Sequence, residues 1–129
     1  MEELFQIFTN VGDASFAVDS QQRILFWNAA AENLVGLSAE VTIGQPCWEV
    51  LQGKTVGGRP FCRPDCPVLH ARQTNQPMRA FDLLVSTSAQ ETLLTNVSTI
   101  FVPPDLRCPV ALIHLQRCPE TPFHWPDPA

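Results

Sequence analysis

Hydrophobic positions in the first part of this chain recur with the spacing of short helices and strands. Residues 2–11 carry an apolar stripe at helical spacing, which predicts an amphipathic N-terminal helix. Residues 15–18 and 23–27 are small, β-branched or aromatic and flank a run of polar turn formers, which predicts a hairpin. Asn28 then precedes an Ala-rich stretch over 29–35, the pattern of a helix with an asparagine cap.

Glycine and proline divide the middle of the chain into shorter elements. A helical turn is expected after Ser38, and another over Cys47 to Leu51. The Gly-rich stretch 54–60 is expected to be a loop with no regular element. Pro67 suits the first position of a helix that continues to Gln73, and this helix start places Cys66 at its N-terminal cap.

The last part of the chain contains three long strand-like runs, over 78–87, 92–102 and 108–118. Alternation in the middle run puts Asn96 on the opposite face from the apolar positions. A meander of three antiparallel strands is the simplest arrangement of these runs. Residues 119–129 carry four prolines, so they are predicted to form an extended tail or linker.

Length and charge restrict the class of protein. A chain of 129 residues with 45% hydrophobic content matches one globular domain. The net charge of −5 argues against a nucleic-acid surface, which needs clustered Lys and Arg. No apolar run approaches the ~20 residues that span a bilayer, and the acidic start lacks the features of a signal peptide. We therefore expect a cytoplasmic protein without membrane contact.

Three of the five cysteines, Cys47, Cys62 and Cys66, lie within about twenty residues and are the candidate functional side chains. In a cytoplasmic protein such cysteines suggest a metal site, a redox switch or plain buried thiols. As metal ligands they favour an iron-sulfur cluster or zinc, each of which normally has four protein ligands. The candidates for the fourth ligand are Cys108, Cys118, His70 or a residue of a second copy.

Two other interpretations of the cysteines remain open. A reversible disulfide, with Cys47 joined to Cys62 or Cys66, is favoured if a helix N-terminus lowers the thiol pKa. Alternatively all three are buried thiols that pack like small hydrophobic side chains. Cys108 and Cys118 lie at strand ends and are followed by proline, so packing alone accounts for them.

The element order, with DASFAVD at 13–19, RILFWNAAAENLVG at 23–36 and VALIHLQR at 110–117, resembles the PAS sensor family over residues 10–118. The resemblance implies an α+β fold with a five-stranded antiparallel sheet in the order 2-1-5-4-3 and short helices on one face. It divides the chain into a cap helix (1–12), a PAS domain (13–118) and a tail (119–129). Such domains sense ligands, redox state or light and commonly form dimers.

The cysteine pattern G-x2-C-x5-G followed by C-x3-C-P, beginning at Gly44, is similar to a cysteine-bearing PAS subgroup of bacterial signalling proteins and LuxR-type regulators. The stretch from Gly44 to Gly53 is also similar to the cysteine motif of light-sensing PAS domains, with one residue too many after Cys47. A flavin is therefore a weaker alternative, as is a haem bound through His70 or His114.

The expected function is a sensory or regulatory module in bacterial signal transduction or transcription regulation, responding to redox state or metal through the cysteine loop. It is expected to act as a homodimer and to signal to an output domain or partner protein. The alternative is a ligand-free interaction and dimerisation scaffold. An enzyme is not expected, because no catalytic triad order, paired-carboxylate site or phosphate-binding loop is present.

Overall fold

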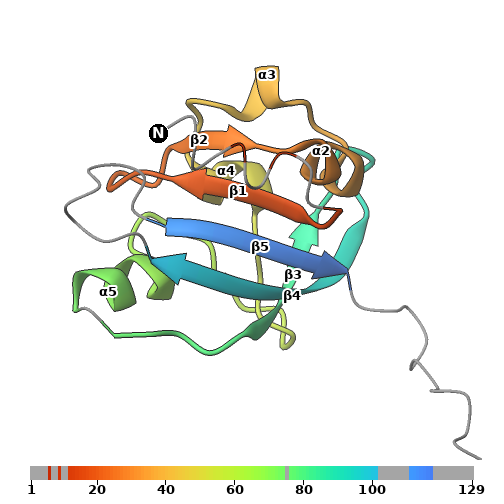
Figure 1. Ribbon diagram of the computed structural model, residues 1–129. Helices are drawn as coiled ribbons and strands as arrows, with labels where there is room; N and C mark the ends of the chain where they lie inside the picture. Colours follow the sequence, from red (N-terminus) through yellow and green to blue (C-terminus); the bar gives the residue numbers. More distant parts are fainter. Residues whose placement is uncertain (1–5, 7–8, 10–11, 75, 102–110, 118–129) are drawn as a thin grey trace, which may run out of the picture.

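The five strands of the chain form one antiparallel sheet in the order β2-β1-β5-β4-β3 (Figure 1). The computed structural model describes residues 6, 9, 12–74, 76–101 and 111–117. This order is the one that the resemblance implies. The strands are β1 (Ala14–Val18), β2 (Ile24–Trp27), β3 (Phe81–Ser86), β4 (Thr92–Phe101) and β5 (Ala111–Arg117).

Four short helices lie between the hairpin and the meander. They are α2 (Ala29–Val35), α3 (Ala39–Thr42), α4 (Cys47–Leu51) and α5 (Pro67–Gln73). The predicted bounds of α2 and α4 are confirmed, and Cys66 is the N-cap of α5, as the position of Pro67 predicted. In Figure 1, α4 lies behind β1, and α5 lies beside the arrowhead of β4.

Asn28 fixes α2 to the first strand. Its side-chain oxygen accepts hydrogen bonds from the Ala31 N–H (2.9 Å), as an N-cap does, and from the Ser15 N–H (3.0 Å). Its amide nitrogen donates to the Asp13 carbonyl (3.0 Å). One buried side chain therefore serves both the start of a helix and the start of β1.

The core lies on the helix-covered face of the sheet. Phe16 of β1 pairs with Trp27 of β2 on one side and Ile113 of β5 on the other, so β1 is flanked by two strands. The buried side chains of this core include Phe16, Ile24, Trp27, Val35, Leu51, Leu83, Val85, Val97 and Leu115. Asn96 lies on the other face and donates to Asp82 (3.1 Å), which agrees with the alternation predicted for β4.

One prediction is confirmed and another needs correction. The stretch 54–60 contains no helix or strand, as predicted, although the Lys54 N–H and C=O each bond Leu84 of β3 at 2.8 Å. The run predicted as a strand over 78–87 forms a strand only over 81–86, since Arg79 and Ala80 precede the paired segment and are exposed. The predicted cap helix (1–12), apart from residues 6, 9 and 12, and the predicted tail (119–129) lie outside the described residues.

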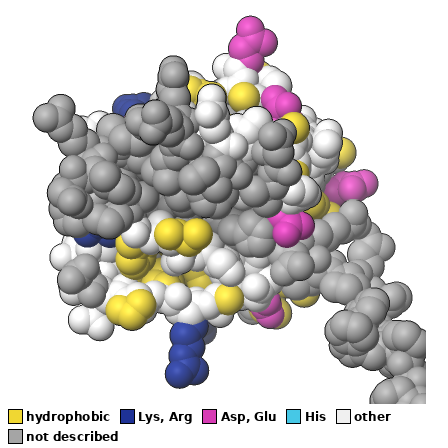
Figure 2. All heavy atoms as spheres, viewed as in Figure 1, with side chains coloured by type: hydrophobic (Ala, Val, Ile, Leu, Met, Phe, Trp, Pro, Cys, Tyr) yellow, Lys and Arg dark blue, Asp and Glu magenta, His cyan; other side chains and the backbone are white. Residues whose placement is uncertain are grey.

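In the part of the chain that the structure describes, no helix is long and apolar enough to cross a membrane. Figure 2 shows one face, on which Lys and Arg side chains are few and scattered, while hydrophobic side chains gather on the lower part, on the side of α5 and β4.

Candidate functional site: a pocket lined by three thiols

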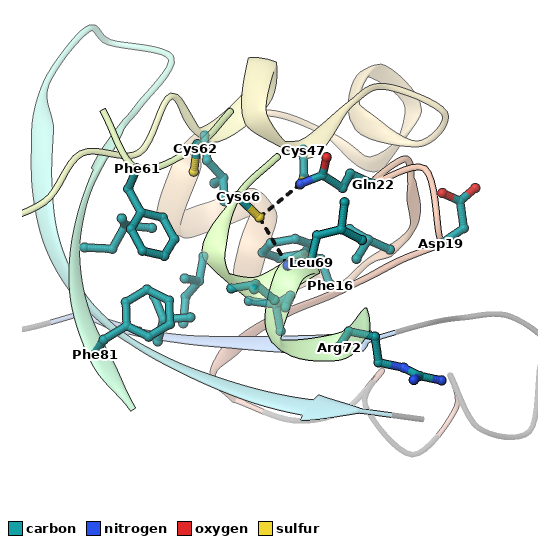
Figure 3. Close-up of a pocket in the computed structure, with 17 residues that line it drawn as sticks. Phe16, Asp19, Gln22, Cys47, Phe61, Cys62, Cys66, Leu69, Arg72 and Phe81 are labelled. Carbon is teal, nitrogen blue, oxygen red and sulfur yellow. Dashed lines mark hydrogen bonds between the residues drawn. The ribbon is translucent and has the colours of Figure 1, made fainter. Parts of the chain in front are cut away.

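A small pocket of about 50 Å³ lies between the sheet and the helices α4 and α5. Its walls are almost entirely apolar. The sheet contributes Phe16, Val18, Leu83, Val97, Ile113 and Leu115. Figure 3 shows that Phe61 and Phe81 stand at one end of the pocket, where their ring centroids are 4.9 Å apart, and that Asp19 and Arg72 stand at the other. The pocket therefore has an aromatic end, and its other end is flanked by Asp19 and Arg72.

All three candidate cysteines line this pocket, and each comes from a different place in the chain. Cys47 is the first residue of α4, Cys62 lies in the segment before α5, and Cys66 is the N-cap of α5. Cys47 and Cys62 are partly buried and Cys66 is buried, and none of the three takes part in a disulfide. The fold therefore brings all three side chains to the lining of one pocket.

Backbone hydrogen bonds explain why the chain folds back and places Cys62 near the end of α4. After the two bonds between Lys54 and Leu84, the chain reverses through a turn in which the Thr55 N–H bonds the Arg59 carbonyl (2.8 Å). The N–H groups of Phe61 (2.9 Å) and Cys62 (3.0 Å) then both donate to the Gly53 carbonyl. The turn closes the loop and places Cys62 against Gly53, two residues after the end of α4.

Gly53 is required at this point because of space. A Cβ atom built on Gly53 would lie 2.6 Å from the Cys62 Sγ and 2.9 Å from a Leu83 methyl carbon. Real Cβ contacts are essentially never this short, so any larger residue would displace the thiol or the strand. The glycine of the C-x5-G pattern is thus explained by the close approach of the cysteine segment to β3.

Cys66 is held by two N–H donors. The side-chain amide of Gln22 donates to its sulfur at 3.0 Å, and the Leu69 N–H of α5 donates at 3.5 Å, as the dashed lines in Figure 3 mark. Gln22 belongs to the β1–β2 turn and is only 4% exposed. Its own carbonyl accepts the N–H of Cys47 (2.8 Å), so a single residue contacts two of the three cysteine positions.

Burial disfavours the thiolate form of two of the thiols. Burial, with smaller contributions from the sulfurs of Cys62 and Cys66, raises the pKa of Cys47 to about 12. Burial also raises the pKa of Cys62 to about 11, although a contact with the Gly53 backbone opposes it. The expectation that a nearby helix start lowers the thiol pKa is therefore wrong for Cys62, because the loss of hydration outweighs the helix contribution.

The described residues do not by themselves supply the metal site predicted from the sequence. Among the described residues, no group of three or more Cys, His, Asp or Glu side chains is placed to hold a metal ion. His70, one candidate for the fourth ligand, is exposed on α5. Cys108 and Cys118 lie outside the described residues. Three thiols line one pocket, but their sulfurs are not gathered around a common point.

The size of the pocket also bears on the flavin and haem alternatives. Ligand and cofactor sites commonly have volumes of about 300–1,000 Å³. A pocket of about 50 Å³ has room for water-sized molecules only. The residues that enclose it therefore fit neither a flavin nor a haem in this conformation.

The sequence did not single out two important residues of the site. Gln22 was placed among the polar turn formers, where a polar residue is expected to be exposed, and it is buried instead. Phe61 lies in a stretch for which the sequence indicates no regular element, yet it packs on Phe81 of β3. The one available signal for Phe61 was its position directly before Cys62, in a segment that has to face the core.

The comparisons with known proteins agree with this architecture. A model of the PAS fold matches residues 2–56, and no curated protein matches the chain. The Rhodobacter sphaeroides LOV protein is similar in structure, with a TM-score of 0.71, 14% identity, and coverage of 95% of this chain and 69% of that one.

Two further solved structures are similar over most of their length. The PAS domain of nitrogen regulation protein NR(II) from Vibrio parahaemolyticus has a TM-score of 0.65 and 19% identity, with 89% of this chain and 97% of that one covered. A domain of a sensory box sensor histidine kinase/response regulator from Geobacter sulfurreducens has a TM-score of 0.65 and 18% identity, with 91% and 92% covered. The fold of this chain is the PAS fold.

Proposed function

We propose that this chain is a sensory module of bacterial signal transduction or transcription regulation, and that its stimulus is oxidation of the thiols at the pocket. The similar domains of the Vibrio nitrogen regulation protein and the Geobacter sensor histidine kinase support a role in signalling. The module has no catalytic activity of its own. It acts as a homodimer and transmits its state to an output domain or a partner protein.

The observation that carries the proposal is that three free thiols, one from the start of α4 and two from the stretch that leads into α5, line one pocket. Two neighbouring thiols and one hydroperoxide can react to form a disulfide. The two thiols lose two electrons and two protons, the O–O bond of the peroxide breaks, and for hydrogen peroxide two molecules of water leave. A bond between two of these cysteines would join segments that are otherwise held by hydrogen bonds and packing.

The size and polarity of the pocket indicate which oxidants reach the thiols. A pocket of about 50 Å³ with apolar walls admits a small neutral molecule such as hydrogen peroxide. A bulky charged disulfide such as oxidised glutathione is excluded by its size and by the cost of removing charged groups from water. We therefore expect oxidation by small neutral peroxides and resistance to large charged disulfides.

A metal is the less supported stimulus. Metal binding would require the three thiols to move, since the described residues hold no group of three ligands around one point. It would also require Cys47 and Cys62 to lose their protons, which burial opposes by raising the pKa of both thiols. A disulfide requires only two sulfurs to meet.

The test uses a variant in which Cys108 and Cys118 are both replaced by Ser, so that only the pocket thiols remain. Reduced protein is treated with hydrogen peroxide or with oxidised glutathione, and disulfides are mapped by mass spectrometry after alkylation. We expect peroxide to produce an intramolecular disulfide between two of Cys47, Cys62 and Cys66, and oxidised glutathione to produce little. If the thiols stay free at peroxide concentrations that oxidise a cysteine peptide, the proposed stimulus is wrong.

The interaction scaffold is the second candidate, and one observation favours it. Val41 is 60% exposed and the nearby Ile43 is 47% exposed, on and beside α3. Exposed apolar side chains that lie together often mark a contact surface. If peroxide leaves all thiols free while replacement of Val41 and Ile43 by Ser abolishes self-association in sedimentation experiments, the scaffold is the better account.

A further inference from the structure

Gln22 occupies an unusual position for a residue in a turn between two strands. Its backbone has φ of 63°, in the left-handed region that few residues other than glycine and asparagine adopt readily. Its side chain is 4% exposed and points toward the cysteine pocket, while its neighbour Gln21 is exposed. The turn therefore directs a polar side chain inward, toward a pocket whose walls are apolar.

The contacts of Gln22 connect the cysteines to the β1–β2 turn. Its side-chain nitrogen donates to the Cys66 sulfur (3.0 Å) and lies 3.4 Å from the Arg63 carbonyl that it also donates to. Its backbone N–H donates to the Asp19 carbonyl (3.0 Å), and its backbone carbonyl accepts from the Cys47 N–H (2.8 Å). One residue thus holds the turn, the start of α4 and the sulfur at the start of α5.

We propose that Cys66 is the thiol on which oxidation begins, and that Gln22 positions its sulfur and transmits its oxidation to the β1–β2 turn. This inference rests on the proposed function, and it names the reacting atom and the coupling residue. Two N–H groups, one from Gln22 and one from Leu69, point at the Cys66 sulfur. Such donors stabilise a sulfur that carries negative charge, which is the form that attacks a peroxide.

The other two thiols are less suited to the first step. Cys47 and Cys62 have pKa values raised to about 12 and about 11, chiefly by burial, so both are protonated near neutral pH. Cys62 can take part in the second step, in which its proton leaves with the displaced hydroxide as water. The Cys66 sulfur attacks the peroxide, the O–O bond breaks, and Cys66 becomes a sulfenic acid while water leaves. The Cys62 thiol then attacks the Cys66 sulfur, a second water leaves, and the disulfide forms.

Formation of that disulfide must disturb Gln22. In a disulfide the two sulfurs are about 2.05 Å apart, so the Cys66 sulfur has to move toward its new partner and away from its two N–H donors. The buried amide of Gln22 then loses an acceptor. Without this side-chain hydrogen bond, the left-handed backbone of Gln22 is less stable, and its backbone hydrogen bonds with Asp19 and Cys47 weaken. We expect the hydrogen bonds at Gln22 and at the start of α4 to open more often.

The test replaces Gln22 by Asn. Asparagine tolerates the left-handed backbone but is one methylene shorter, so it keeps the turn and removes the amide from the sulfur. Gln21→Asn is the matched control, because Gln21 is the exposed neighbour in the same turn. Gln22→Glu is the second variant, since it keeps the length and places a carboxylate oxygen against the sulfur.

The first measurement is the site of earliest oxidation in protein that lacks Cys108 and Cys118. Sulfenic acid is trapped with dimedone during brief peroxide treatment and located by mass spectrometry. We expect the label on Cys66, and a rate lower by about tenfold in Gln22→Asn and Gln22→Glu, with no change in Gln21→Asn. A label that appears first on Cys47 or Cys62, or a rate unchanged in both Gln22 variants, overturns the inference.

The second measurement is amide hydrogen exchange in the reduced and peroxide-treated protein. We expect oxidation to speed exchange at the N–H groups of Gln22 and Cys47 in the wild type, and to have little further effect in Gln22→Asn. Equal exchange before and after oxidation in the wild type refutes transmission through the turn. If no disulfide forms at all, the proposed function itself fails, so the two failures are distinguishable.

Discussion

Raising the pH from 7 to 10 should destabilise this protein mainly through its buried thiols. A cysteine thiol in the unfolded chain titrates near 9.0, whereas burial raises the pKa to about 12 for Cys47 and to about 11 for Cys62. Between these values the unfolded chain releases protons that the folded chain retains. The stabilisation from the neutral buried thiols is therefore complete below pH 9 and is lost progressively as the pH rises toward 11 to 12.

The size of the effect follows from these values. At pH 10, one unit above the unfolded pKa, each thiol contributes about 1.4 kcal/mol to the loss of stability if it stays protonated in the folded state. The two contributions share the interaction between Cys47 and Cys62, so we expect about 2 kcal/mol for the pair rather than their full sum. With a urea slope of about 2 kcal/mol per molar, the unfolding midpoint should fall by about 1 M.

Urea unfolding at pH 7 and pH 10, in the presence of a phosphine reductant, measures this difference. Tyrosine and lysine side chains contribute little to the difference between these pH values, because the sequence has no tyrosine and Lys54 is its single lysine. The matched control is the double variant Cys47→Ala with Cys62→Ala, which lacks both titrating groups. We expect the control to lose most of the change in midpoint between the two pH values.

Two results would refute the reasoning. An unchanged midpoint at pH 10 in the wild type would mean that the thiols are hydrated in the folded protein and titrate as in the unfolded chain. A fall of the same size in the double variant would mean that other groups cause the alkaline loss. In either case the pocket would not be the enclosed apolar environment on which the proposed selectivity for small peroxides depends.

Two further predictions concern the packing around the site. Asn28→Ala should destabilise the fold by about 2 to 3 kcal/mol in urea unfolding, because it removes a helix cap and leaves buried backbone groups without their partner. The control Asn33→Ala, at an exposed position of the same helix, should cost under about 0.5 kcal/mol. Equal losses would contradict the role of Asn28. Gly53→Ala should cost about 1 to 3 kcal/mol by overpacking, and part of that loss should disappear in the Cys62→Ala background. Additive losses in that double variant would show that the two residues do not collide.

The sequence predicted the secondary structure well because local signals agreed with the fold. Asn28 caps the start of α2 and Gly36 caps its end, and Pro67 is the first residue of α5. Alternation along β4 put Asn96 on the outer face, where its side chain bonds Asp82. Such signals act within a few residues, so they can be identified without knowledge of the tertiary structure.

The site was less predictable, because its properties arise from contacts between distant segments. Gln22 is 44 positions from Cys66, and nothing in the turn itself indicates that the side chain is buried. The pKa of the Cys62 thiol, which was expected to be lowered but is raised, could not be predicted for the same reason. A helix start is visible in the sequence, but the burial that outweighs it depends on how α4, α5 and the sheet enclose the pocket.

The chain on either side of α4 makes backbone hydrogen bonds to both edge strands of the sheet, β2 and β3. Before α4, the Ile24 N–H bonds the Gln45 carbonyl (2.9 Å) and the Gly44 N–H bonds the Ile24 carbonyl (2.8 Å), so β2 has a neighbour on its outer side. After α4, Lys54 occupies the corresponding side of β3 at Leu84. These bonds use backbone groups to which a strand of another copy would otherwise bind. Edge-to-edge pairing of sheets between copies is therefore disfavoured, and we expect self-association to use the faces of the molecule rather than the sheet edges.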